Sequence, residues 1–153
     1  MFERVKTVIA ASSLGLVVMA TAALAGPADD AIKARQACMK AHGGVMAVAV
    51  PVMKGEKAFD AAALKEASDK EDAACAGWDT FWGADTQQGE SAETWTKPEI
   101  WTDMAGFQAA GGAWWEAAQK LRAATDEASF KATFPAVGKG CQDCHEKFRR
   151  PKG

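Results

Sequence analysis

Five residues near the C-terminus, Cys141 to His145, read Cys-Gln-Asp-Cys-His and form a C-x-x-C-H motif. Its two thiols are three residues apart, and residues at that spacing are neighbours on one face of a helix. Two thiols placed in this way can each add across a vinyl group of one haem, and the adjacent imidazole can then bind the iron. The spacing is the signature of covalent c-type haem attachment. The motif therefore predicts one haem c bound through Cys141 and Cys144, with His145 as the proximal iron ligand.

Two other uses of this motif are less favoured. A structural zinc site needs four ligands, usually from two paired Cys-rich turns. The remaining candidates, Cys38, His42 and Cys75, do not form a second C-x-x-C pair. A thioredoxin-like redox site lies in a βαβ pattern, and no segment of this sequence shows sustained strand alternation.

The first residues predict export. Arg4 and Lys6 precede an apolar run over 8–25 that closes on Ala-Leu-Ala, which is typical of a signal-peptidase site. We expect residues 1–25 to be a removed secretory signal peptide and not a retained membrane anchor. Residues 26–153 would then form a single haem-binding domain in the periplasm.

The composition of the expected mature chain excludes one class of partner. Removing the signal peptide takes Lys+Arg from 18 to 16 and Asp+Glu from 20 to 19, a net charge of −3. A balance this mild argues against nucleic-acid binding. The basic C-terminal end carries Lys147, Arg149, Arg150 and Lys152, and it is either a solvated helix terminus or part of a docking surface for an acidic redox partner.

Helical periodicity recurs in four segments, and we expect helices over about 29–53, 59–81, 98–121 and 130–148, with a loop over 83–96. Pro51 marks a kink or the end of the first helix. The motif cysteines continue the apolar stripe of the last segment, so they should face the core. The pattern predicts an all-α fold, an antiparallel up-down-up-down four-helix bundle that encloses the haem. The six tryptophans are expected to build the core and the haem wall.

Six short stretches carry a family resemblance: Arg35-Gln36-x-x-Met39, Ala76-Gly77-Trp78, Glu93-Thr94, Pro98-Glu99-Ile100-Trp101, Val137-Gly138-Lys139-x-Cys141 and Phe148-Arg149. With them, residues 28–150 resemble the class II c-type cytochromes, the family of cytochromes c′ and c-556. The resemblance implies a periplasmic protein with redox or gas-binding chemistry, and often a homodimer.

The resemblance also implies roles for side chains outside the motif. Arg35 and Gln36 match a haem-contacting pair, and a guanidinium suits a haem propionate because its planar donors meet a carboxylate bidentately. Glu93 and Thr94 match a loop pair at the haem edge, although they can also be read as ordinary polar loop residues. Arg149 follows the proximal histidine by four residues, so it either lies beside the porphyrin or is simply solvated.

Met39 matches the position on the distal side of the iron, and two interpretations remain open. A bound thioether gives a six-coordinate centre with a raised potential, whereas a thioether that only packs leaves the sixth position free. Met39 also belongs to a heptad of apolar residues (Ile32, Met39, Met46, Met53), which is the usual pattern of core filler. We favour coordination, because the stretches over 54–56 and 59–62 look more like the c-556 branch.

The best-supported function is electron transfer without transformation of a substrate, so we expect no enzyme. The alternative is a five-coordinate protein that binds NO or CO at an open distal site. Peroxidase activity is disfavoured, because only His42 would offer a distal base. Cys38 and Cys75 are either a disulfide between the first two helices or two buried thiols.

Overall fold

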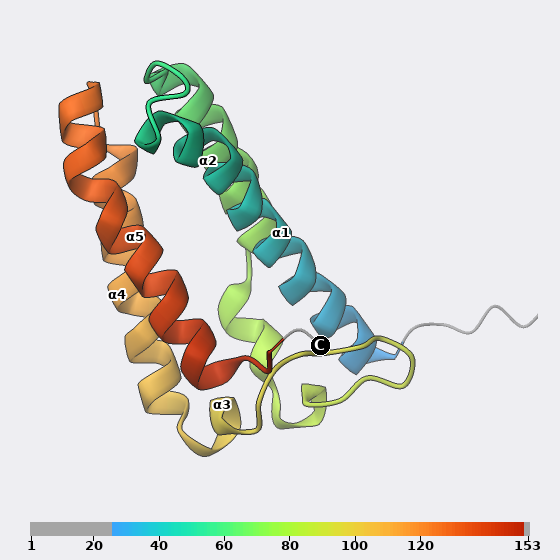
Figure 1. The fold of residues 1–153 in the computed structure, drawn as a ribbon. Helices are drawn as coiled ribbons and strands as arrows, with labels where there is room; N and C mark the ends of the chain where they lie inside the picture. Colours follow the sequence, from blue (N-terminus) through green and yellow to red (C-terminus); the bar gives the residue numbers. More distant parts are fainter. Residues whose placement is uncertain (1–25, 152–153) are drawn as a thin grey trace, which may run out of the picture.

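The computed structural model describes residues 26–151, and this part of the chain is built from helices without a β-strand element (Figure 1). The four long helices are α1 (Pro27–Met53), α2 (Ala61–Cys75), α4 (Met104–Arg122) and α5 (Glu127–Phe148). Shorter pieces are the 3-10 helices η1 (Trp78–Trp82) and η2 (Ala84–Thr86) and the single turn α3 (Glu99–Thr102). The predicted all-α four-helix bundle is confirmed. The predicted signal peptide lies outside the described residues.

The bundle is assembled from two helix pairs. α1 packs mainly on α2, and α4 packs mainly on α5 (Figure 1). The ends of the helices are marked by their sequences. Asp60 caps α2 by accepting hydrogen bonds from the backbone N–H groups of Ala62 and Ala63, and Asp126 forms a capping box with Ser129 at the start of α5.

Two of the predicted helices are shorter than expected. The segment predicted to run to residue 81 ends as α2 at Cys75, because Gly77 adopts a positive φ of 79° and the chain continues as the 3-10 helix η1. The segment after Pro98 is divided at Asp103, whose non-helical backbone ends α3. The side chain of Asp103 then caps α4 by accepting from the N–H of Gly106. Pro51 lies in the last turn of α1, which ends at Met53.

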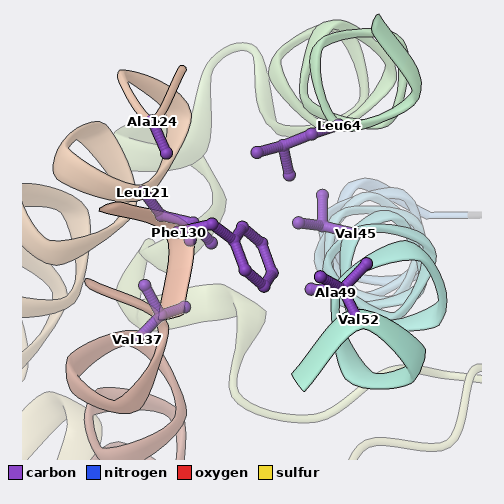
Figure 2. Close-up of a cluster of buried hydrophobic side chains, with 8 residues drawn as sticks. All are labelled: Val45, Ala49, Val52, Leu64, Leu121, Ala124, Phe130 and Val137. Atoms are coloured by element: carbon purple, nitrogen blue, oxygen red, sulfur yellow. The ribbon is translucent and has the colours of Figure 1, made fainter. Parts of the chain in front are cut away.

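A hydrophobic cluster fills the bundle between the two helix pairs (Figure 2). Its buried members come from all four long helices and the turn after α4: Val45, Ala49, Val52, Leu64, Leu121, Ala124, Phe130 and Val137. The ring of Phe130 points from α5 toward Val45 and Ala49 of α1 (Figure 2). This cluster closes one part of the bundle, so a cofactor has to be held elsewhere.

The buried face of α1 does not follow the heptad of Ile32, Met39, Met46 and Met53, although Ile32 belongs to both. Ile32, Cys38, Val45, Ala49 and Val52 are buried on this helix. Met46 and Met53 are partly buried and pack against the hydrophobic cluster, whereas Met39 is 37% exposed. The interpretation of Met39 as core filler is therefore wrong. With the buried Asp29 and Arg35 included, successive buried positions differ by three, four or seven residues, so the stripe follows the helical period and passes beside Met39.

Two cross-connections tie the N-terminal half together. Cys38 of α1 and Cys75 of α2 form a disulfide with a Cα–Cα distance of 4.7 Å, which resolves the question left open by the sequence. At the start of α1, the buried Asp29 carboxylate accepts hydrogen bonds from the backbone N–H groups of Ser91 and Ala92 and from the Ser91 hydroxyl. These bonds lower the pKa of Asp29 to about 2. The loop before α3 is thereby held against the end of α1.

Candidate functional site

A cavity of about 520 Å³ lies beside the second apolar cluster of the bundle. Its walls come from α1, η1, the loop before α3, α3, α4 and the C-terminal end of α5: Ile32, Arg35, Gln36, Met39, Lys40, Trp78, Trp82, Thr94, Trp95, Thr96, Ile100, Phe107, Cys144, His145, Phe148 and Arg149. The volume is in the range of small-molecule and cofactor sites. Six of the eight predicted site residues line this cavity, and Cys141 and Glu93 do not.

The motif lies in the last two turns of α5, at the edge of this cavity. Cys144 and His145 line the cavity itself, whereas Cys141 lines a narrow adjoining pocket between α1, α2, α4 and α5. Burial raises the pKa of both thiols. Burial also lowers the pKa of His145, and the nearby charges of Arg149 and His42 lower it further. A neutral imidazole is the form that binds a metal, so the lowered pKa favours metal binding by His145.

Arg35 is the most deeply buried charged group of the cavity wall, with 4% of its surface exposed. Its Nε donates to the carbonyl of Ala31 at 3.3 Å, and its Nη2 donates to the carbonyl of Thr86. The guanidinium also lies over the ring of Trp82, 4.7 Å from the ring centroid. Arg35 is therefore fixed in place by one contact within α1 and by contacts with η1 and η2.

Two buried N–H donors of this wall are left unpaired within the described residues, Nη1 of Arg35 and Nε1 of Trp82. A buried donor without a partner is costly. The Arg35 guanidinium is also a buried cation of the cavity wall, and a haem carries two propionates whose charge a cation would neutralise. Together with two thiols, an imidazole and an aromatic wall, these donors form a set that fits a covalently bound haem.

The remaining sequence-predicted residues are placed differently from one another. Gln36 lines the cavity, and its Nε2 donates to the backbone carbonyl of Glu93 at 2.7 Å. Thr94 is buried in the wall, and its hydroxyl shares a 2.9 Å hydrogen bond with that of Thr96. The Glu93 side chain is exposed and does not line the cavity. The loop pair is therefore joined to α1 through the backbone of Glu93 and not through its carboxylate.

Met39 and Arg149 both line the cavity, on different elements. Met39 extends from α1, so a thioether from one helix and the imidazole of His145 from another share one cavity. Arg149 is the first residue after α5, and its guanidinium lies 5.3 Å from the centroid of the Trp95 ring. His42, the only distal base considered from the sequence, does not line the cavity.

The sequence did not single out several wall residues. Trp82, Trp95, Ile100 and Phe107 contribute apolar surface to the cavity, and Trp82 contacts the Phe107 ring edge-on with centroids 4.6 Å apart. Trp78, Trp82 and Trp95 line the cavity, and their role as a haem wall stays a prediction. Lys40 had no signal beyond its position next to Met39. In the described part of the chain, no helix has the length and apolar character needed to cross a membrane.

Comparison with known proteins agrees with this geometry. Residues 30–149 match the family model described as Cytochrome C'. A cytochrome c' of Alcaligenes xylosoxydans xylosoxydans is 34% identical over 131 residues, which cover 81% of this chain and 96% of that protein. A cytochrome c-556 of Agrobacterium fabrum is 28% identical over 154 residues, covering 99% of this chain and all of that protein.

Solved structures give the same result for the fold. The crystal structure of cytochrome c' from Rubrivivax gelatinosus superposes with a TM-score of 0.71 at 30% identity, over 80% of this chain and 97% of that one. A nitric oxide complex of a cytochrome c prime variant from Alcaligenes xylosoxidans has a TM-score of 0.69 at 30% identity, over 82% and 97%. From the helical bundle, the cavity at the C-x-x-C-H motif and these matches, the chain belongs to the cytochrome c′ family, whose members bind haem c covalently.

Proposed function

We propose that this protein is a periplasmic electron carrier that holds one haem c and transforms no substrate. The observation that supports the proposal most is that Met39 of α1 and His145 of α5 line one cavity. A thioether from one helix and an imidazole from another thus lie where both could bind a single metal ion. When bound, haem c supplies a one-electron Fe(III)/Fe(II) couple, and a histidine–methionine ligand pair raises its potential.

The other residues of the wall would hold and tune the group. Cys141 and Cys144 would form the two thioether bonds, and His145 would be the proximal ligand. Arg35, whose side chain lines the cavity, would pair with a propionate and neutralise its charge. The aromatic and aliphatic wall would exclude water, and a low dielectric around the iron is one of the ways in which a protein sets a redox potential.

A carrier also needs a place to dock, and the charge at the cavity edge supports one. Lys147 and Arg150 are exposed and Arg149 is half-buried, all beside the C-terminal end of α5. Basic side chains around a redox site steer an acidic partner protein toward it. The predicted signal peptide and the family support a periplasmic location. The homodimer stays a prediction from the family resemblance.

A second candidate function is NO or CO binding at an open distal position. Solved structures similar to this chain include cytochrome c prime variants of Alcaligenes xylosoxidans in complex with nitric oxide and with carbon monoxide. In that case Met39 would only line the distal side, and its exposure of 37% would reflect a side chain that leaves room for a diatomic ligand.

Optical and EPR spectra of the purified holoprotein, ferric and ferrous, with and without CO, discriminate between the two functions. A low-spin centre that resists CO and becomes high-spin in Met39→Ala supports the electron carrier. Met46→Ala is the matched control, since Met46 lies on the same helix and packs on the hydrophobic cluster. A high-spin wild-type centre that takes up CO would overturn methionine ligation and favour gas binding.

A further inference from the structure

A second group of reactive side chains lies outside the haem cavity, where α1 faces α2. The Cys38–Cys75 disulfide joins the two helices, and His42 follows Cys38 by one helical turn. His42 Nε2 lies 3.7 Å from Cys38 Sγ. The two sulfurs and the nearest imidazole nitrogen lie within 4.8 Å of one another. The proposed electron transfer uses none of these three residues.

The imidazole is held in a single orientation by its neighbours. The other ring nitrogen, Nδ1, is hydrogen-bonded to the buried carboxylate of Glu71 from α2. Arg122 of α4 pairs with the second oxygen of that carboxylate. The His42 ring also lies against the indole of Trp114, with centroids 4.4 Å apart. Nε2 therefore faces Cys38 Sγ. The sulfur, the imidazole and the orienting carboxylate follow one another in the same order as in sites that activate a nucleophilic cysteine.

Glu71 keeps its charge in this arrangement. Burial alone would raise the pKa of Glu71, but hydrogen bonds from His42 and Arg122 outweigh burial and lower it. With Nδ1 bonded to this carboxylate, Nε2 is the ring nitrogen that faces Cys38 Sγ, and a proton carried on Nε2 can be donated to that sulfur. The cluster can thus deliver a proton to Cys38 Sγ.

The two sulfurs of the disulfide are not equivalent. Cys38 is 1% exposed in the middle of α1, whereas Cys75 is partly exposed as the last residue of α2. An incoming thiolate therefore has more access to Cys75 than to Cys38. The C-terminal end of α2 carries partial negative charge, which disfavours a thiolate at Cys75. Exposure and charge both make Cys75 the attacked sulfur and Cys38 the leaving group.

We propose that Cys75, Cys38, His42 and Glu71 form a thiol–disulfide exchange site whose substrates are thiols. A thiolate attacks Cys75 Sγ and forms a new S–S bond. The Cys38–Cys75 bond breaks, its electron pair passes to Cys38 Sγ, and His42 Nε2 gives that sulfur a proton. The products are a mixed disulfide on Cys75 and a thiol on Cys38. With a dithiol, its second sulfur attacks the mixed disulfide, and the net reaction yields two protein thiols and one oxidised dithiol.

The regiochemistry of the mixed disulfide tests the proposal directly in the holoprotein. Of the four cysteines, the haem thioethers occupy two, so Cys38 and Cys75 are the ones that can exchange. Folded ferric protein is treated with reduced glutathione, quenched with iodoacetamide and digested for mass spectrometry. We expect glutathione on Cys75 and carbamidomethyl on Cys38. Glutathione on Cys38, or equal labelling of both, would overturn the proposal.

The rate of reduction by dithiothreitol tests the role of His42. We expect His42→Ala to slow the release of thiols by at least about tenfold, in keeping with the usual effect of general acid catalysis. Lys65→Ala, on the exposed face of α2 where Lys65 pairs with Asp69, is the control and should react like wild type. Circular dichroism verifies that each variant is folded. An unchanged rate in folded His42→Ala, or a wild-type disulfide that reacts only as fast as the protein unfolds, would refute the exchange site.

Discussion

Removing the Cys38–Cys75 cross-link should destabilise the protein by several kcal/mol. The disulfide joins residues 37 positions apart, so its loss frees a long loop in the unfolded chain. In the chain-entropy treatment, a loop of that length corresponds to about 4 kcal/mol at 25 °C. The two helices it connects already pack along their length, so the native fold should persist while the unfolded state gains entropy.

The assay is urea unfolding of the holoprotein followed by circular dichroism at 222 nm. The double variant Cys38→Ala/Cys75→Ala should lose about 3–4 kcal/mol in the free energy of unfolding. Its m value should rise slightly, because an unlinked chain exposes more surface when it unfolds. The matched control is wild type held reduced with a phosphine, which has the same side chains but no cross-link. It should lose a similar amount.

Two results would refute this reasoning. A loss below about 1 kcal/mol in both samples would mean that the disulfide does not restrict the unfolded chain as its loop length requires. A large loss in the alanine variant with none in reduced wild type would attribute the effect to packing at the buried Cys38 and not to the cross-link.

Three further perturbations follow from the structure. Phe130→Ala should cost about 3–5 kcal/mol in urea unfolding, because the ring is 1% exposed at the centre of the cluster in Figure 2; a loss below 1 kcal/mol would contradict this packing. Asp29 has a folded pKa of about 2, lowered from 3.8 by its hydrogen bonds to Ser91 and Ala92, so its contribution to stability is present above pH 4 and is lost as the pH falls toward 2. Urea midpoints measured from pH 5 to pH 2 should therefore fall less steeply in Asp29→Asn than in wild type, and parallel curves would argue against this linkage. Arg35→Gln should lower the haem midpoint potential by roughly 40 mV, or about 1 kcal/mol for one electron, because a cation near the iron favours the ferrous form; protein-film voltammetry that shows no decrease would count against Arg35 as a neighbour of the haem.

The haem class and the helical architecture could be predicted from local patterns. The C-x-x-C-H motif depends on residues within one turn of helix, and the apolar periodicity depends on residues within one segment, so both are present in the linear sequence. The ends of the helices do not follow from these patterns alone. Gly77 and Asp103 interrupt helices whose apolar periodicity continues past them. The periodicity of apolar residues does not reveal a non-helical break of two or three residues.

Other features depended on which helix faces which. The heptad containing Met39 was compatible with core or cavity, and only the packing of α1 on its neighbours left this side chain 37% exposed at the cavity. Glu93 matched a family position, yet its backbone and not its carboxylate contacts α1. The pairing of Cys38 with Cys75 and the His42–Glu71–Arg122 cluster join residues 29 to 51 positions apart. Contacts over such separations are set by the relative placement of whole helices, and no local spacing in the sequence encodes them.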